Sequence, residues 1–221
     1  MKITDVKLIY AKHYLFVHIY TDEGIVGLGE AGNWGHLMAT AEAIKKFSTY
    51  LIGKDPSRID DIGQNLYRSL YFRGSVIMSA ISAIDIALWD IKGKKLGVPV
   101  YELLGGKTRD KVRVYASPMH KETDPEALKQ SYRELKDQGF TAAKIFVNGP
   151  IKSENGGRDE FYCGRVEDEL EKVAMIREAV GKDFDLILEA HRGMTMPEAI
   201  AFGREVEKYR PMVFEDPITP D

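Results

Sequence analysis

The feature that most constrains the fold is the alternation of short apolar runs with amphipathic segments after residue 110. The runs are rich in β-branched residues and are predicted to be strands, at residues 112–117, 142–147, 185–190 and 212–215. The segments between them have helical spacing, so each predicted strand is joined to the next by a crossover. Because crossovers of this kind connect parallel strands, residues 111–221 are predicted to form repeated βα units.

The first 110 residues have a different pattern. Apolar and polar residues alternate over 2–10 and 14–20, and residues 24–30 are typical of a hairpin return, so this part predicts a small antiparallel sheet. Three stretches of helical spacing follow, at residues 37–52, 57–70 and 75–96. The third is apolar on nearly every face, which favours a buried helix. We therefore predict an α+β domain at residues 1–110 and a βα domain at residues 111–221.

Composition and charge exclude several classes of protein. Lysine and arginine total 31 against 34 aspartate and glutamate, a formal net charge of −3, and basic residues do not cluster with aromatic ones, so we expect no nucleic-acid partner. No apolar run approaches the ~20 residues of a membrane span and no targeting segment is evident, so we expect no membrane association. Cys163 is the single cysteine, which rules out an intramolecular disulfide and favours a cytoplasmic location.

Acidic residues lie at the ends of the last two predicted strands. In residues 185–191 the strand alternation puts Glu189 and His191 on one face. A carboxylate at the carboxyl end of a buried parallel strand is costly unless it is paired or binds a metal. Glu215 ends the next strand, and neighbouring strands lie about 4.8 Å apart, so the two carboxylates could hold one Mg²⁺. The alternative is that both only cap helix N-termini or pair with Arg192.

Lys144 lies in the middle of the predicted strand at residues 142–147, with apolar neighbours on both sides. It is either a solubility residue on an edge strand or an inward-facing charge, and its predicted adjacency to Glu189 favours the second interpretation. An inward Lys144 would meet a substrate carboxylate or a metal ligand. The polar segment 148–165 follows this strand at its carboxyl end, where long loops are often functional, although a plain insertion is the alternative.

One long segment resembles a known family. Residues 73–106, which contain the run Ala-Ile-Asp-Ile-Ala-Leu-Trp-Asp-Ile-Lys-Gly and end on Leu-Leu-Gly-Gly, closely resemble the mandelate racemase and muconate lactonizing enzyme family of the enolase superfamily. Glu215-Asp216-Pro217 resembles the acidic metal-ligand motif of that family. The resemblance implies an α+β capping domain over a modified (β/α) barrel, of which this chain would carry about the first four βα units. It also implies one Mg²⁺ at the strand ends, with Glu189 and Glu215 as ligands.

The same resemblance implies a class of reaction. Lys144 matches the first lysine of the family's Lys-x-Lys motif, but Phe146 stands where the second lysine would be, which disfavours the lysine-based proton abstraction of racemases and cycloisomerases. His191 instead resembles the histidine acid of the family's sugar-acid dehydratases, of the galactonate, gluconate and mannonate type. Imidazole suits that role because it exchanges protons near neutral pH.

For those dehydratases, the implied mechanism is a metal-assisted β-elimination. A base removes the proton α to the substrate carboxylate, and Mg²⁺ and Lys144 stabilise the enediolate. His191 protonates the departing 3-hydroxyl, which leads to a 2-keto-3-deoxy acid. The expected partner is therefore a small sugar acid.

Three further residues are candidates for substrate binding. Trp34 and Arg73 fall where the resemblance places loops of the capping domain that close over the substrate, and Arg192 lies beside His191. For Trp34, packing on the capping domain is an equally good interpretation. The family's habit of symmetric assembly favours a homo-oligomer.

The predicted barrel is incomplete. A (β/α)₈ barrel has eight strands, and four are predicted here, so the third metal ligand and the general base that the resemblance implies are not in this sequence. Because an open parallel sheet exposes edges and an apolar face, we expect the chain to be completed by a second polypeptide or as part of a longer gene product, and to be inactive alone. The alternatives are a racemase or cycloisomerase of the same superfamily, or a non-catalytic half-barrel that persists as a subunit or remnant.

Overall fold

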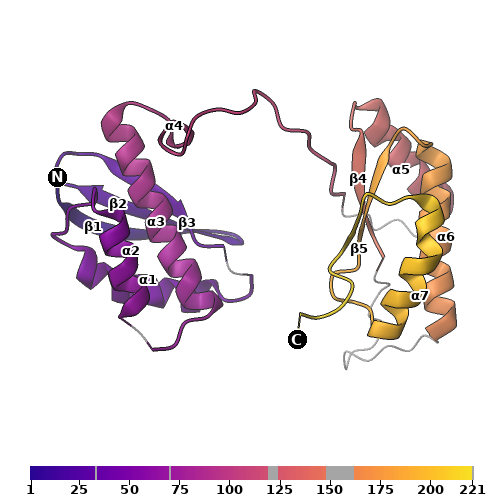
Figure 1. Cartoon of the computed structure of the whole chain (residues 1–221), viewed down its shortest axis with the longest axis horizontal. Helices are drawn as coiled ribbons and strands as arrows, with labels where there is room; N and C mark the ends of the chain where they lie inside the picture. Colours follow the sequence, from indigo (N-terminus) through magenta and orange to yellow (C-terminus); the bar gives the residue numbers. More distant parts are fainter. Residues whose placement is uncertain (33, 70, 119–123, 148–161, 221) are drawn as a thin grey trace. The chain divides into compact units, whose positions relative to one another are not determined.

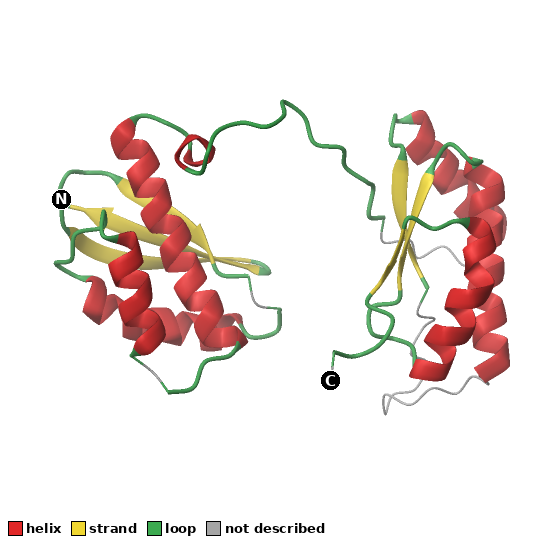
Figure 2. Cartoon of the chain, in the orientation of Figure 1, coloured by secondary structure: helices red, strands yellow, loops and turns green. Residues whose placement is uncertain are grey.

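The chain forms two compact units, Met1–Asp110 and Lys111–Asp221. The computed structural model describes residues 1–32, 34–69, 71–118, 124–147 and 162–220. Figure 1 colours the two units along the sequence, and Figure 2 shows that the first combines helices with an antiparallel sheet and the second combines helices with a parallel one. Each unit is described by itself.

The first unit packs helices on one face of a three-stranded antiparallel sheet of order β1-β2-β3. Its elements are β1 (Ile3–Ala11), β2 (Tyr14–Thr21), β3 (Val26–Glu30), α1 (Leu37–Leu51), α2 (Ile59–Arg68), α3 (Ser75–Leu96) and the short α4 (Val100–Leu103). Along β2, Leu15, Val17 and Ile19 are buried against the helices while the residues between them are less buried, as alternation along a strand requires. The predicted sheet and its three main helices are confirmed, with ends shifted by up to two residues.

Helix α3 lies unusually close to the edge strand β3. A Cβ atom at Gly29 would stand 1.9 Å from the carbonyl oxygen of Ala83, and one at Gly27 would stand 2.2 Å from that of Ala87. Asp90 of the same helix accepts a hydrogen bond of 2.8 Å from the Leu28 N–H. The helix therefore binds the backbone of the edge strand, which is otherwise free to pair with another chain.

The prediction that α3 is a buried helix is confirmed for one face only. One face of the helix lies in the core, but Ile86 and Met78 are 46% and 40% exposed. The sheet can cover only one face of the helix, and within this unit the remaining apolar residues of α3 stay in contact with solvent.

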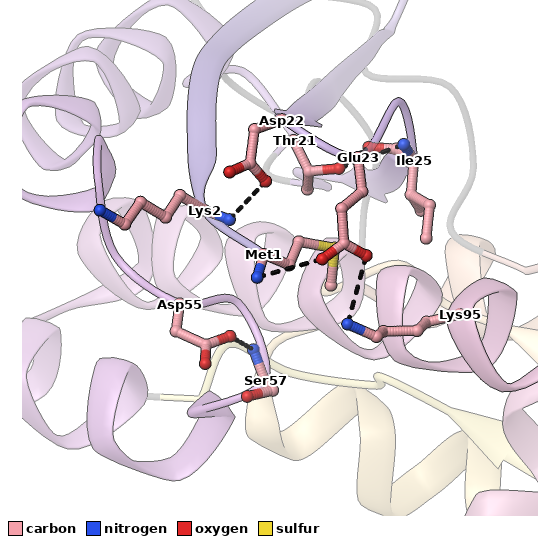
Figure 3. A network of polar contacts seen from close by, with 9 residues as sticks. All are labelled: Met1, Lys2, Thr21, Asp22, Glu23, Ile25, Asp55, Ser57 and Lys95. Atoms are coloured by element: carbon pink, nitrogen blue, oxygen red, sulfur yellow. Dashed lines mark hydrogen bonds and ion pairs between the residues drawn. The ribbon is translucent and has the colours of Figure 1, made fainter.

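A polar network joins the start of the chain to the turn between β2 and β3 (Figure 3). The carboxylate of Glu23 contacts the amino group of Met1 at 3.2 Å and Lys95 Nζ at 3.3 Å. The hydrogen bond from the amino group and that from Lys95 hold the pKa of Glu23 below its usual value. Asp22 accepts a hydrogen bond of 2.7 Å from the Lys2 N–H. The network thus connects β1, the turn and the end of α3.

The second unit is built from three parallel strands in the order β4-β5-β6. Its elements are α5 (Pro125–Asp137), β4 (Ala142–Phe146), α6 (Tyr162–Val180), β5 (Asp185–Glu189), α7 (Met196–Val206), the 3₁₀ turn η1 (Glu207–Tyr209) and β6 (Val213–Glu215). The helices lie on one side of the sheet (Figure 2), where Ile145 and Leu188 join the core. The two predicted crossovers that join β4 to β5 and β5 to β6 are confirmed.

The first strand predicted for this unit, at residues 112–117, was wrong as a strand. Only Ala116 forms a bridge to β4, with its N–H donating to Ala142 and its carbonyl accepting from Lys144. Val112 and Val114 are 71% and 63% exposed, so their apolar side chains gain no burial from a strand conformation within this unit. The number of barrel units therefore stays a prediction.

The predictions of a polar loop and of no membrane association can be compared with the structure only in the described residues. Most of the polar segment 148–165 lies outside the described residues, and α6 begins at Tyr162, inside the predicted loop. In the ranges that the structure describes, no helix combines the length and the apolar character needed to cross a membrane.

The contact between α3 and β3 can be tested with a single methyl group. Replacing Gly29 by Ala forces the methyl onto a backbone carbonyl, so we expect the first unit to lose about 3 kcal/mol of stability or more. The measurement is urea unfolding of the whole chain followed by tryptophan fluorescence, because Trp34 and Trp89, the two tryptophans, are both in this unit.

Gly63→Ala is the matched control. Gly63 lies inside α2 with nothing within 4 Å of its Cβ position, so this change should be neutral or stabilise by up to about 1 kcal/mol. Equal effects of the two substitutions would contradict the close-contact explanation.

Candidate active site

Three charged side chains meet at the carboxyl ends of the parallel strands. Lys144 Nζ of β4 lies 2.9 Å from an oxygen of Glu189 in β5 and 2.8 Å from an oxygen of Glu215 in β6. The strand register explains this contact, because Phe146, Glu189 and Glu215 are neighbours across the sheet. Lys144 lies two residues before Phe146 and therefore on the same face of the sheet. Lys144 and Glu189 are only 8% and 5% exposed.

This geometry decides between the two interpretations of Lys144. Lys144 is an inward charge and not a solubility residue on an exposed edge. Glu189 and Glu215 pair with Lys144, and among the described residues neither forms an ion pair with Arg192. Phe146 is half-buried on the same face as Lys144, where the family pattern would place a second lysine.

Lys144 and Glu189 keep their charges through contacts within the cluster. Burial lowers the pKa of Lys144, but the hydrogen bonds to Glu215 and Glu189 outweigh burial and raise the pKa overall. Burial would raise the pKa of Glu189, but Lys144 and the backbone N–H of His191 lower it overall. The site is therefore a lysine ammonium between two carboxylates, with one negative charge in excess.

Two convergent carboxylates have the chemistry of ligands for a hard cation. Glu189 and Glu215 each place an oxygen within 2.9 Å of Lys144 Nζ, and carboxylate oxygens are the ligands that Mg²⁺ prefers. Mg²⁺ takes about six oxygen ligands in an octahedral arrangement. In the part of the chain that the structure describes, no group of three or more acidic, histidine or cysteine side chains gathers. The residues fit Mg²⁺ as two of its ligands.

The turn after β5 departs from the expected strand. The strand ends at Glu189, and His191 and Arg192 have φ angles of 46° and 59°, so strand alternation does not place His191 beside Glu189. Instead, the His191 N–H donates a hydrogen bond of 2.7 Å to Glu189 Oε1. The His191 side chain is exposed, and its Nε2 lies 3.5 Å from the guanidinium of Arg192.

Backbone strain is concentrated at this edge of the sheet. Asp216, directly after β6, has φ 43°, and its carbonyl accepts a hydrogen bond of 2.6 Å from the Arg192 N–H. His191, Arg192 and Asp216 are three of the five non-glycine residues with positive φ among the described ranges. Such conformations cost about 1–3 kcal/mol each and often occur at functional sites.

One aromatic neighbour of the site was not predicted from the sequence. Lys144 Nζ lies 5.7 Å from the centre of the Tyr115 ring, within the range of a cation–π contact. Tyr115 lies next to Ala116, whose bridge to β4 brings the ring to the lysine. A tyrosine among alternating valines is an ordinary strand pattern, so no signal in the sequence marked it.

The two candidates from the first unit have local contacts there. Trp34 is 88% exposed, and its ring stacks on that of His13 at 5.9 Å between centroids. Arg73 donates a hydrogen bond of 2.9 Å to the Tyr67 carbonyl and places its guanidinium 4.1 Å from the centre of the Tyr67 ring. The structure describes the two units separately, so the roles of Trp34 and Arg73 stay predictions.

The dependence of the site on Lys144 can be measured as stability. In Lys144→Met, the two carboxylates lose their shared counter-ion, and because Glu189 is buried we expect the second unit to lose about 3 kcal/mol. The measurement is hydrogen exchange of the β5 amides. Lys208→Met is the control, because the exposed Lys208 side chain forms a loose ion pair with Glu205 at 3.8 Å and lies 5.3 Å from the centre of the Tyr209 ring. A similar loss in both variants would contradict the assignment.

Comparison with known proteins identifies the family. Residues 4–105 match the model of the mandelate racemase / muconate lactonizing enzyme N-terminal domain, and residues 127–221 match that of the enolase C-terminal domain-like family. The D-galactonate dehydratase of Xanthomonas euvesicatoria is 40% identical over 220 residues, which cover 99% of this chain and 56% of that protein. The chain thus spans little more than half the length of this relative.

Solved structures agree with that assignment. An enolase from Pantoea ananatis with bound D-gluconate and Mg superposes with a TM-score of 0.88 at 31% identity, over 99% of this chain and 60% of that one. The 3,6-anhydro-D-galactonate cycloisomerase of Zobellia galactanivorans superposes with a TM-score of 0.83 at 32% identity, over 100% and 60%. The chain belongs to the mandelate racemase and muconate lactonizing enzyme family of the enolase superfamily.

Proposed function

We propose that the protein of which this chain forms the capping domain and first βα units dehydrates a sugar acid, an aldonate, to a 2-keto-3-deoxy acid. The observation that carries the proposal is the cluster of Lys144, Glu189 and Glu215 at the carboxyl ends of three parallel strands. Sites in (β/α) architectures are built at that end of the strands. The names of the relatives, one a D-galactonate dehydratase and one a protein with bound D-gluconate, support the substrate class.

Lys144 is suited to bind the substrate carboxylate. An ammonium group has three N–H donors, and Glu189 and Glu215 accept from two of them. The third can donate to a carboxylate oxygen of the substrate, which gains negative charge as the α-proton leaves. Burial strengthens this interaction because little water competes for the ammonium group.

His191 is proposed to protonate the departing 3-hydroxyl, so that this group leaves as water. Its backbone N–H is bonded to Glu189, which ties the residue to the carboxylate cluster while the imidazole stays exposed at the end of β5. Arg192, in the same turn, is proposed to contact a substrate hydroxyl or carboxylate. Trp34 and Arg73 are proposed to contribute from the first unit.

Glu189 and Glu215 are the residues that would hold Mg²⁺. When bound there, the ion would supply Lewis-acid stabilisation of the negative charge that forms on the substrate. Both side chains come from strand ends, so the backbone of the sheet fixes the positions of the two ligands.

We further propose that turnover needs residues beyond those described. The described ranges supply two carboxylate ligands and an acid, but the base and a third ligand have to come from elsewhere. A continuing chain, a complementing polypeptide or a homo-oligomer could provide them. On this proposal the 221-residue chain is inactive alone.

Metal binding tests the ligand assignment directly. We expect Glu189→Gln and Glu215→Gln to weaken the binding of Mn²⁺, a spectroscopic substitute for Mg²⁺, by at least about tenfold, because each removes a charged ligand. Electron paramagnetic resonance of free Mn²⁺ gives the affinity. Glu205→Gln, an exposed change on α7, should leave the affinity unchanged. Unaltered binding in both site variants would refute the assignment.

The reaction itself is tested on the assembly isolated from the producing organism. With D-galactonate or D-gluconate in D₂O, His191→Asn should lower the rate of 2-keto-3-deoxy acid formation by about 10²–10⁴-fold. Exchange of the α-proton with solvent should continue, because the base is a different group. If His191→Asn lost both α-proton exchange and dehydration, His191 would not be the acid. Full dehydration in this variant would lead to the same conclusion.

A cycloisomerase is the second candidate. It is favoured by the structural likeness to the 3,6-anhydro-D-galactonate cycloisomerase. The two reactions differ in the product, because a dehydratase releases water and a cycloisomerase gives a product with the mass of its substrate. Mass spectrometry of the product therefore separates them. The absence of both activities in the isolated assembly would favour a non-catalytic half-barrel.

A further inference from the structure

The backbone polar groups of Lys144 point away from β5. In a parallel ladder, the N–H and the C=O of one residue lie on the same side of the strand. The Lys144 N–H donates a hydrogen bond of 2.8 Å to the carbonyl of Ala116, so the Lys144 carbonyl also lies on the side of residues 112–117. On that side β4 has one bridging residue and not a full neighbouring strand.

The segment beside β4 cannot satisfy the Lys144 carbonyl. If the ladder continued past the bridge at Ala116, the next donor would be the N–H of residue 118. That residue is Pro118, which has no N–H. Lys144 is buried, and a buried carbonyl without a hydrogen bond costs free energy comparable to that of a lost bond. A donor from another element is therefore needed at this point.

Tyr132 of α5 supplies that donor. Its hydroxyl donates a hydrogen bond of 2.8 Å to the Lys144 carbonyl, and Tyr132 is only 2% exposed, in the core of the second unit. Burial raises the pKa of the hydroxyl, so the group stays protonated and remains a donor. A phenylalanine ring could fill the same space without burying a polar group. Packing alone therefore does not account for the hydroxyl.

We infer that Tyr132 is a positioning residue whose hydroxyl holds the backbone of β4 so that Lys144 Nζ lies between Glu189 and Glu215. The carbonyl and the side chain of Lys144 share one Cα atom, so a shift of this backbone moves Nζ relative to the carboxylate oxygens, which lie 2.9 and 2.8 Å from it. The meaning of this restraint for substrate binding rests on the proposed function, but the restraint itself is a property of this chain.

The experiment is hydrogen exchange followed by NMR in the whole chain, with Tyr132→Phe and Ile176→Val compared with the unaltered protein. Tyr132→Phe removes only the hydroxyl. Ile176→Val removes one methylene group from the buried core at α6 and is the control for a loss of global stability. The exchange rate of the Lys144 amide is divided by that of the Leu188 amide in β5, because a loss of global stability accelerates both alike.

In Tyr132→Phe this ratio should rise at least about tenfold, because the Lys144 carbonyl loses its donor and the edge of β4 opens locally. The ammonium hydrogens of Lys144, observed in a chain with ¹⁵N-labelled lysine, should exchange with water at least about fivefold faster, because their contacts with the two carboxylates loosen. The signal that is missing in Lys144→Met identifies this ammonium group. Neither quantity should change in Ile176→Val.

Two outcomes would overturn the inference. An unchanged ratio in Tyr132→Phe would mean that the hydroxyl contributes only global stability. A higher ratio with unchanged ammonium exchange would mean that the hydroxyl holds the backbone but does not position Nζ. If Tyr132→Phe does not fold in buffer, all three proteins are measured in trimethylamine N-oxide, which favours the folded state, and the same two quantities decide. The measurement needs no turnover, so a failure of the dehydratase proposal is seen separately, in the activity assay.

Discussion

The ammonium group of Lys144 is the interaction on which the candidate site depends. It lies between the carboxylates of Glu189 and Glu215 and so connects the ends of β4, β5 and β6. Two carboxylates that converge in this way repel each other at the edge of a buried sheet. The shared lysine offsets that repulsion, and its contact with Glu189 lowers the pKa of that carboxyl group.

The turns that follow β5 and β6 lie beside this cluster and adopt backbone conformations that cost stability. His191, Arg192 and Asp216 adopt left-handed conformations, and they are held there by hydrogen bonds between the turn after β5 and the segment after β6. Arg165 of α6 pairs with Glu198, which caps α7 at Thr195. The cluster therefore lies beside strained connections whose conformations are set by their surroundings.

Much of the fold and part of the site could be predicted from sequence. Periodicity identified the antiparallel sheet, the helices and the parallel βα order, because the burial of apolar side chains imposes these periods. The same patterns placed Lys144, Glu189 and Glu215 on strands at one edge of a sheet, where the structure brings them together. Periodicity failed at residues 112–117, which have the residue types of a strand but only one bridging residue, Ala116. It failed at His191 as well, because alternation describes a strand and the strand ends at Glu189.

The sequence by itself determined the spacing of apolar and polar residues. This spacing was sufficient to predict most helices and strands, the parallel order of the strands and the acidic residues at the strand ends. Only the tertiary structure decided that Lys144 is shared by both carboxylates, that Tyr115 lies beside it, and that Arg165 reaches Glu198 from another helix. The physical reason is that these contacts join residues distant in the chain. The distances between these side chains depend on strand register and helix packing, and a local sequence pattern does not determine either of them.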